Sequence, residues 1–468
     1  MNSIGRRKAS LTLLDRLNKS TALLAMCLAL GSTGFSTAYA QSPQDFALTV
    51  IERNPEIQAR WFEFLASAQD LRQARGSYMP SVDLSATAGR VDREDMLQEY
   101  NRSQAQLSVT QLLFDGFRVR REVGQAHFFQ LIRYYEFLDT AERVVLEGLA
   151  AYYDNRRYNT LVALAQENYN NHQRVHGQIE NRVGSGLSTS ADLSQITGRL
   201  ALAESNLHTE TSNLHDVTQR YLRLSGNMPG QPSQVSDIAV NLPASIDDVL
   251  NVAYTRSPAF HAAITGIEAA DEGVGMRRSR YMPTVELRAR HTHNDNLYGV
   301  ERMGQNDGYE NVVELVVNYN LFRGNSDRAA TRAAYERANR ARALRDKACV
   351  DLRQTASIAF NDVNTLRTQL TALRIHRDNA NSVAVAYQDQ FGIGQRGLLD
   401  VLDAQNESFQ ARRAVVHAEH DLLIAQLSTL AAMGNLLTTL GVTRSDMPSL
   451  SDLNARPVEV DPSNACMR

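Results

Sequence analysis

The sequence lacks the features that indicate a heavily cross-linked protein or one anchored by membrane helices. It contains three cysteines in 468 residues. Cys27 lies in an apolar run near the N-terminus, so no disulfide framework holds the fold; the sequence leaves open whether Cys349 and Cys466 pair. Beyond the first 40 residues no segment reaches the about 18 consecutive apolar residues of a membrane-spanning helix. If the chain enters a membrane, it must do so as strands.

Motifs for catalysis and cofactor binding are also missing. We find no nucleophile motif, phosphate-binding loop or metalloprotease signature, so we predict that the protein is not an enzyme and uses no cofactor. Two pairs of histidines have suitable spacing within a helix or a strand, but neither pair has a third ligand at a spacing that suits zinc. We therefore predict no metal site at His172 and His176 or at His291 and His293.

The first 40 residues have the composition of an export signal. Basic residues precede an apolar run from Ala22 to Leu30, and Ala38-Tyr39-Ala40 offers small residues for cleavage. Met26 is a poor lipobox residue before Cys27, which argues against a lipid anchor. This segment carries five basic residues and one acidic residue, so the formal charge of −3 for the whole chain becomes −7 without it. A mildly acidic chain does not suit phosphate-backbone binding, and we predict no nucleic-acid partner.

The rest of the sequence is organised around a glycine-rich stretch, residues 391–405. Gly392, Gly394 and Gly397 have the spacing of a dinucleotide-binding fingerprint. That fingerprint requires a buried strand before it and a βαβ unit around it, whereas residues 377–390 are polar and helical in character. We therefore interpret the stretch as a turn that leads into a helix.

The same turn occurs earlier in the chain, because the sequence is a tandem repeat of roughly 200 residues. The glycine turns recur 208 residues apart and a Tyr-Met-Pro motif recurs 203 residues apart. A unit of this length is too long for a solenoid repeat. The matched positions are Gly184 with Gly392, Gly186 with Gly394, Asp192 with Asp400, Pro80 with Pro283, and residues 113–116 with 321–324.

Each copy is predicted to contain a helix, a strand hairpin and two long helices. Alternation of apolar and polar residues predicts strand hairpins at 81–114 and 284–322. Pro80 and Pro283 stand where the helical period gives way to the strand period. Because proline disfavours helical geometry in the residue before it, we predict that both prolines form helix–strand joints.

The long helices turn at the glycine stretches and return. On each return segment, large apolar residues recur every seven residues, beginning at Leu193 and at Leu402, which predicts coiled-coil packing. The tail after residue 440 is polar and is predicted to be loosely ordered. The predicted organisation is an export signal (1–40), a first repeat (41–228, long helices 117–224), a linker (229–243), a second repeat (244–440, long helices 325–438) and a polar tail (441–468).

Together these features resemble the TolC family of outer-membrane channel proteins. The most specific residues are Asn54-Pro55 and the segments 78–80, 113–116 and 394–404, and the resemblance covers nearly all of the chain after the signal. It implies a mainly α fold with a β-barrel portion: long coiled-coil helices form a periplasmic tunnel, and four transmembrane strands per protomer contribute to a 12-stranded barrel in a trimer. The physics of the bilayer supports a barrel that several protomers share, because hydrocarbon does not tolerate the two open edges of a four-stranded sheet.

The resemblance also implies a function and partners. The chain would be the passive exit duct of a tripartite export system in the outer membrane of a Gram-negative bacterium, extending into the periplasm. It would act as a homotrimer in contact with outer-membrane lipid, a periplasmic adaptor protein and an inner-membrane ABC or RND transporter. The missing lipobox favours type I protein secretion. Small-molecule efflux is the nearer alternative, and a periplasmic coiled-coil adaptor without a pore is the alternative of another class.

Finally, the resemblance points to a periplasmic gate. Asp400 and Asp403 stand one helical turn apart and match an acidic pair that lines the constriction, although the same spacing also suits a solvated first turn of a helix. Arg396 matches a basic residue that holds the entrance closed by pairing with an acid on the sibling turn, and Asp192 matches that acid. Phe391 departs from the family, which often has tyrosine there. Whether the gate is closed at rest is left open.

Overall fold

The structure is a computed structural model that describes residues 42–93, 98–230, 238, 240–295 and 308–466. The predicted export signal and most of the predicted linker lie outside these residues. All helices and strands discussed below belong to one compact unit, which begins at Pro43 and leaves out the segment around residues 230–236.

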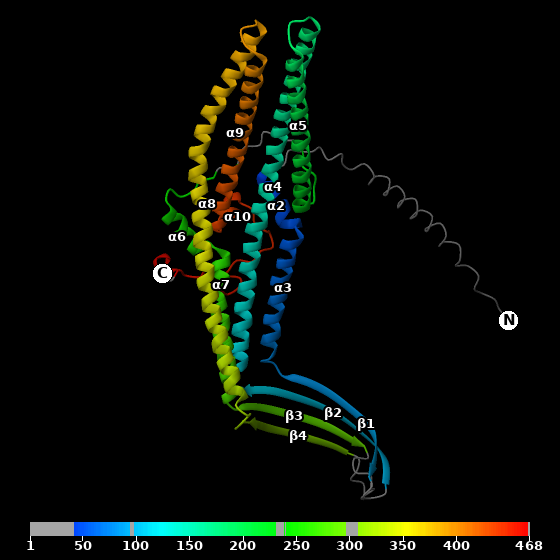
Figure 1. The fold of residues 1–468 in the computed structure, drawn as a ribbon. Coiled ribbons are helices and arrows are strands. Elements are labelled where there is room, and N and C mark those ends of the chain that lie inside the picture. Colours follow the sequence, from blue (N-terminus) through cyan, green and yellow to red (C-terminus); the bar gives the residue numbers. More distant parts are fainter. Residues whose placement is uncertain (1–41, 94–97, 231–237, 239, 296–307, 467–468) are drawn as a thin grey trace, which may run out of the picture. The chain divides into compact units, whose positions relative to one another are not determined.

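Helices dominate this unit and four strands accompany them, as the sequence predicts (Figure 1). No described helix is both long enough and apolar enough to cross a membrane. The first copy consists of α2 (Pro43–Arg53), α3 (Pro55–Gly76), β1 (Ser81–Arg93), β2 (Gln98–Phe114), α4 (Arg118–Gly184) and α5 (Ser190–Ser225). The second consists of α6 (Ile246–Arg256), α7 (Pro258–Arg278), η1 (Ser279–Tyr281), β3 (Thr284–Asp295), β4 (Gly308–Asn318), α8 (Ser326–Gly392) and α9 (Leu398–Ala432), followed by α10 (Leu436–Leu440) and η2 (Pro462–Asn464).

The same device starts α3 and α7. Asn54 precedes Pro55, and its side chain accepts a hydrogen bond from the Glu56 amide at 2.9 Å. In the second copy Ser257 precedes Pro258, and its hydroxyl accepts a hydrogen bond from the Phe260 amide at 3.4 Å. A polar side chain before the helix pairs with a backbone amide that has no partner within the helix. Proline suits the first turn because the N–H group that it lacks would have no partner there. The duplicated sequence motif is therefore a duplicated helix start.

Pro80 and Pro283 lie immediately before β1 and β3. The preceding helices end earlier than the prolines, at Gly76 and Arg278. Met282 has the extended backbone, with φ −105° and ψ 155°, that a residue before proline favours. The position of the prolines between helix and strand is as the sequence indicates, and their role in setting the joint stays a prediction.

The connection between β2 and α4 packs against the α7–β3 joint at Gly116. This glycine has a φ of +68°, and a Cβ atom there would lie 2.6 Å from Cβ of Met282 and 2.7 Å from the Ser279 carbonyl oxygen. Only glycine fits such an approach. The neighbouring Asp115 carboxylate accepts a hydrogen bond from the Val119 amide at 2.9 Å in the first turn of α4. One motif thus fixes both the contact between the copies and the start of a long helix.

The four strands form one antiparallel sheet in the order β1-β2-β3-β4 (Figure 1), with β1 and β4 at its edges. The register places apolar residues in one row across all four strands and polar residues in the adjacent row, whose side chains point to the opposite face of the sheet. The apolar row consists of Val82, Val109, Ala289 and Val313. The polar row consists of Ser81, Thr110, Arg288 and Glu314.

The apolar face of the sheet is uncovered. Leu84 is 77% exposed, Val313 74% and Leu315 60%. On the opposite face, an ion pair of 3.6 Å joins Arg290 to Glu314. β4 ends at Asn318, so Tyr319 and Leu321, which continue the alternating pattern in the sequence, lie beyond the strand.

The largest core joins helices of both copies. Phe46 of α2 packs on Tyr221 of α5 with ring centroids 4.7 Å apart, and Trp61 of α3 packs on Phe137 of α4 at 5.3 Å. The seven-residue repeat of the second return segment is buried at Leu402, Phe409 and Leu430, as coiled-coil packing requires.

A break after α9 interrupts that repeat. Gly434 has a φ of +63°, and a Cβ atom there would lie 2.8 Å from the Arg256 carbonyl oxygen. The close approach of α6 ends α9 at Ala432, and Leu437 belongs to the short helix α10. The predicted continuous helix to residue 438 is therefore divided.

The C-terminal segment packs against the helices. Val442 and Leu453 join the main core, Ala465 is buried, and a disulfide links Cys466 to Cys349 of α8. The expectation of a loosely ordered tail is wrong for residues 441–466. The segment is polar on average, but it contains a few widely spaced apolar residues, and these pack into the core individually.

A buried carboxyl connects α4 to α10. Glu142 is 6% exposed and accepts hydrogen bonds from the amides of Leu436 at 3.2 Å and Leu437 at 3.3 Å. Burial raises the pKa of Glu142 to about 8, although the two amides act in the opposite direction. The folded protein therefore keeps this carboxyl protonated at pH values where an exposed glutamate is ionised.

This shift predicts a pH-dependent stability. The unfolded chain ionises Glu142 near its ordinary pKa of 4.5 and the folded chain near a pKa of about 8, so the folded state binds more protons between these values and its stability falls as pH rises through them. Glu142→Gln retains an oxygen acceptor and does not titrate. We expect its thermal midpoint to fall less across this window than that of the wild type. Glu147→Gln, which removes an exposed carboxyl of the same helix, is the control, and equal pH profiles for both variants would contradict the assignment.

Candidate gate at the helical turns

Two glycine turns join the long helices, one between α4 and α5 and one between α8 and α9 (Figure 1). Gly186 and Gly394 adopt the left-handed backbone, with φ +76° and +79°. A 2.8 Å hydrogen bond closes each turn, from the Leu187 amide to the Arg182 carbonyl and from the Gln395 amide to the Gln390 carbonyl. Both turns end a helix by the same geometry.

The remaining predicted turn glycines play a different part. Gly184 and Gly392 are the last residues of α4 and α8, and neither has a positive φ. Nothing lies within 4 Å of where their Cβ atoms would stand. The conformational requirement for glycine therefore falls on one residue in each turn.

Asp192 caps the start of α5. Its carboxylate accepts hydrogen bonds from the Thr189 amide at 3.0 Å and the Thr189 hydroxyl at 2.9 Å, and the Thr189 hydroxyl accepts one from the Asp192 amide at 3.2 Å. This reciprocal arrangement is a capping box. The sequence signal of this box is the spacing of Thr189 and Asp192, three residues apart.

Arg396 is held by its own turn and helices. Its Nε donates a hydrogen bond to Oε1 of Gln390 at 2.8 Å, its guanidinium lies 4.2 Å from the ring centroid of Tyr387, and Nη1 lies 3.9 Å from the Asp400 carboxylate. Among the described residues of this chain, no ion pair joins Arg396 to Asp192. The predicted pairing is thus not made within one chain, because each partner is satisfied closer by.

Phe391 belongs to an apolar cluster that joins the ends of all four long helices. It is 6% exposed, and the Arg182 guanidinium lies 4.7 Å from its ring centroid. Aromatic burial and a cation–π contact here take the place of a hydroxyl's hydrogen bond. The cluster consists of Val175, Ile179, Ile196, Phe391, Leu398, Val401 and Leu402.

The acidic pair has two different partners. Asp400 and Asp403 lie in the first two turns of α9, and their side chains are 49% and 60% exposed. Asp400 faces Arg396, whereas Asp403 accepts a 2.8 Å hydrogen bond from Nη2 of Arg199 on α5. Sequence reasoning missed Arg199. It directly precedes Leu200 of the seven-residue repeat, a flanking position that often forms ion pairs between helices.

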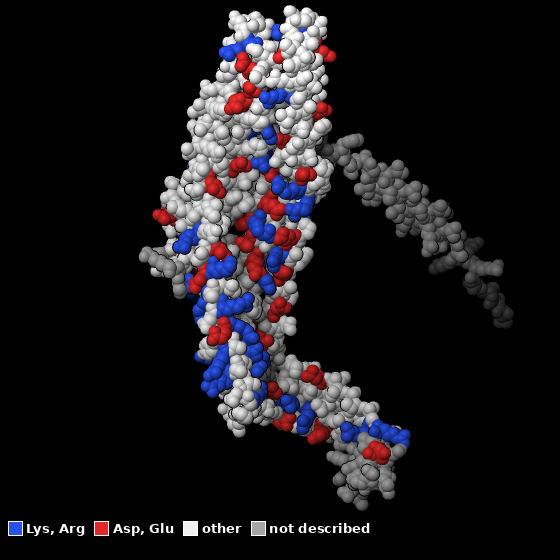
Figure 2. All heavy atoms as spheres, in the orientation of Figure 1, with Lys and Arg blue, Asp and Glu red and all other residues white. Residues whose placement is uncertain are grey.

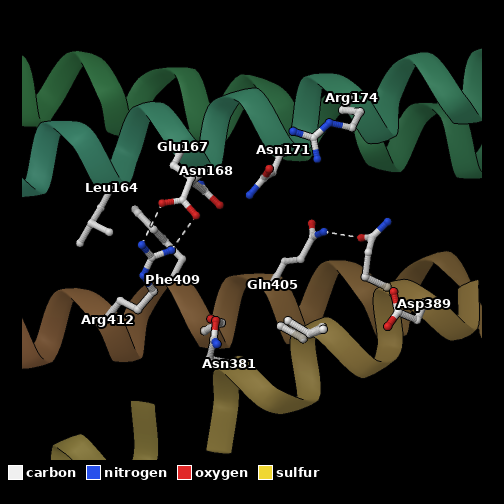
Figure 3. Close-up of a pocket in the computed structure, with 14 residues that line it drawn as sticks. Leu164, Glu167, Asn168, Asn171, Arg174, Asn381, Asp389, Gln405, Phe409 and Arg412 are labelled. Carbon is white, nitrogen blue, oxygen red and sulfur yellow. Dashed lines mark hydrogen bonds and ion pairs between the residues drawn. The ribbon is translucent and has the colours of Figure 1, made fainter. Parts of the chain in front are cut away.

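Three more ion pairs cross from the first helical pair, α4 and α5, to α9. Arg412 donates two hydrogen bonds of 2.8 Å to Glu167 (Figure 3), and this bidentate contact lowers the pKa of Glu167. Farther along, Arg157 pairs with Asp421 at 2.8 Å. The third pair joins Arg413 to Glu210, which is 3% exposed.

On the face drawn in Figure 2, acidic and basic side chains lie interspersed along the helices. Arg412 and Glu167 line a pocket between the helices, which Figure 3 shows. In the same pocket Gln405 of α9 donates a 2.7 Å hydrogen bond to Gln388 of α8. Exposed ion pairs are individually weak. The contact between the two helical pairs therefore rests mainly on apolar packing, in the cluster at the turns and in a second cluster that joins Leu161 and Leu164 of α4 to Phe409 of α9, and the polar links add to it.

The histidines contribute to packing. His172 is 4% exposed, and its Nδ1 lies 2.9 Å from the Asn168 carbonyl oxygen. Burial lowers its pKa. On the sheet, His291 and His293 stack on Tyr309 with ring centroids 5.4 and 4.7 Å apart. The described part of the chain contains no group of three side chains that could hold a metal ion.

Comparison with known proteins identifies similar chains. The model of a family described as outer membrane efflux protein matches residues 49–227 and 249–435, one segment in each copy. The outer membrane protein TolC of Escherichia coli is 22% identical over 94% of this chain and 91% of its own length. The alkaline protease secretion protein AprF of Pseudomonas aeruginosa is 24% identical over 80% of each chain. The solved CmeC outer membrane channel of Campylobacter jejuni has a TM-score of 0.75 at 12% identity and covers 91% of this chain and 90% of its own.

The turn geometry makes a prediction that separates neighbouring glycines. Gly394→Ala forces a side chain into a left-handed backbone, which costs about 1–2 kcal/mol. Gly392→Ala changes a helical residue with open space around it and should be neutral or stabilising by up to about 1 kcal/mol. Thermal unfolding of the purified protein measures both. Equal midpoints for the two variants would contradict the assigned turn.

Proposed function

Because the chain belongs to the outer membrane efflux protein family, we propose that it is the outer-membrane exit duct of a tripartite export system. It conducts substrate passively across the periplasm and the outer membrane. The observation that carries this proposal is the uncovered apolar face of the four-stranded sheet, with polar side chains on the opposite face. An apolar outside and a polar inside are what a lipid-embedded wall around an aqueous path requires.

The sheet edges support a wall shared between copies. β1 and β4 are the edges of the sheet in the described chain, and unpaired edge groups are costly in hydrocarbon. Eight strands is the usual minimum for a closed transmembrane sheet, so one copy is too few. Three copies of four strands exceed that minimum, and we propose a homotrimer in contact with outer-membrane lipid.

We propose the partners from what a passive duct requires. A passive duct needs an energy source, which we assign to an inner-membrane ABC or RND transporter joined through a periplasmic adaptor protein. The exposed turns between the long helices are the proposed docking sites. A periplasmic adaptor without a pore would have no use for a sheet with an uncovered apolar face, and outer-membrane fractionation distinguishes the two.

For the cargo we propose polypeptides exported by type I secretion. The poor lipobox at Cys27 supports this, and the relative AprF is named for the secretion of a protease. Small-molecule efflux is the second candidate, favoured by the description of the family. Cross-linking in native membranes tests the choice: recovery of an ABC transporter supports secretion, and recovery of an RND transporter supports efflux.

The proposed gate consists of Asp192, Phe391, Arg396, Asp400 and Asp403. In a trimer the acidic pair supplies six carboxylates around the path, and their mutual repulsion opposes closure. The 3.9 Å contact of Arg396 with Asp400 offsets part of this repulsion. The Asp192 capping box fixes the start of α5 beside it.

Planar-bilayer recording tests both the duct and its gate. We expect the purified wild type to conduct with a preference for cations, because carboxylates line the proposed constriction. Replacing both Asp400 and Asp403 with alanine should weaken that preference and reduce block by multivalent cations. Arg396→Ser should raise the conductance. Unchanged selectivity and block in the first variant, with unchanged conductance in the second, would place the constriction elsewhere.

The lipid-facing assignment predicts a difference between adjacent residues of β4. Leu315→Arg places a charge on the apolar face and should cost about 2–4 kcal/mol near the membrane midplane, which lowers the yield of assembled protein. Val316→Arg places the same charge on the opposite face, where its cross-strand partner is Glu286, and should be tolerated. The amount of assembled protein in outer-membrane extracts measures this. Normal assembly of Leu315→Arg would refute the orientation of the sheet.

A further inference from the structure

Arg199 forms an ion pair with Asp403 and belongs to the helical pair of α4 and α5, whereas Asp403 belongs to the pair of α8 and α9. Within the described residues, Asp403 has no other ion-pair partner from α4 or α5. The 2.8 Å contact joins α5 to α9. The Arg199 side chain is 31% exposed, whereas that of Asp403 is 60% exposed. The acid is therefore paired on one side and accessible to dissolved ions on the other.

The accessible side of Asp403 opens on a groove of acidic character. Asp400, Asp403 and Glu407 line it, with His376 and Tyr387 of α8. His376 Nε2 lies 3.3 Å from the Glu407 carboxylate. A cation in this groove would approach the carboxylate that Arg199 already holds.

We propose that Arg199 is a specificity-determining residue of the duct, which partly neutralises Asp403 and ties α9 to α5. This inference rests on the proposed function. Cation preference at the constriction is then set by a competition for Asp403 between the Arg199 guanidinium and a cation on the path. Of the two acids, Asp400 is the less neutralised. Its cationic neighbour Arg396 lies 3.9 Å away and also donates a hydrogen bond to Gln390.

The neighbouring groups discussed here do not replace Arg199 as the cation beside Asp403. His172 on α4 is buried, and burial lowers its pKa, with the positive charge of Arg199 lowering it further. His172 therefore stays neutral at physiological pH and does not replace Arg199 as a cation. The other three pairs between the helical pairs use Glu167, Glu210 and Asp421, so none of them holds an acid of the proposed constriction.

The test uses the purified full-length protein in planar bilayers under a KCl gradient. Arg199→Gln frees Asp403, and we expect the K⁺ to Cl⁻ permeability ratio to rise about two- to fivefold, the factor by which an exposed ion pair commonly shifts an equilibrium. The Mg²⁺ concentration for half block should fall by a similar factor. Adding Asp403→Asn to Arg199→Gln should bring both values back toward the wild type, and Arg199→Lys, which keeps the charge, should stay close to it.

The matched control is Arg223→Gln. Arg223 lies on the same helix and pairs with Glu147, but it is about 36 Å along the helix from Arg199. Wild-type values in Arg223→Gln with a raised ratio in Arg199→Gln support the inference. A wild type that conducts, with equal ratios in the two glutamine variants, overturns the role of Arg199 and leaves the duct intact. A wild type that does not conduct overturns the proposed function and this inference with it.

Discussion

The structure depends on a sheet that is incomplete in a single chain. One face of β1 to β4 exposes valine and leucine side chains, and the sheet has an edge at each side. Water penalises the exposed apolar face, and hydrocarbon penalises the unpaired backbone edges. In the proposed trimer, lipid around a sheet shared between copies removes both penalties. The long helices then have a fixed base, because Gly116 and Asp115 join the strands to the start of α4 and to the second copy.

Duplication explains how one chain supplies two matched helical pairs with different chemistry. The backbone of the turns is the same, with Gly186 and Gly394 in the left-handed region. The side chains differ: the first turn uses its acid, Asp192, to cap a helix, whereas the second has no side-chain cap and leaves Asp400 exposed. The first copy thus holds its helix start firmly, and the second offers charge to the solvent.

The sequence predicted the features that depend on local periodicity and on short motifs. The strands follow from alternation such as that of Val313, Leu315 and Val317, and the resemblance to TolC-family channels is confirmed by the match of the family model to both copies. Contacts that depend on how distant helices align were not predictable. The pair of Arg199 with Asp403 requires the register of α5 against α9, and the packing of the tail requires apolar contacts that its polar composition conceals. The pairing of Arg396 with Asp192 was expected from resemblance alone, and nearer partners take both residues within the chain.

The central claim is that several copies complete one duct, and the number of chains in the membrane-extracted protein tests it most directly. Native mass spectrometry of the protein extracted from outer membranes measures this number without any variant. The account predicts a species with the mass of three chains after removal of the signal. A monomer in the membrane extract, or a protein recovered only from the soluble periplasmic fraction, would contradict it.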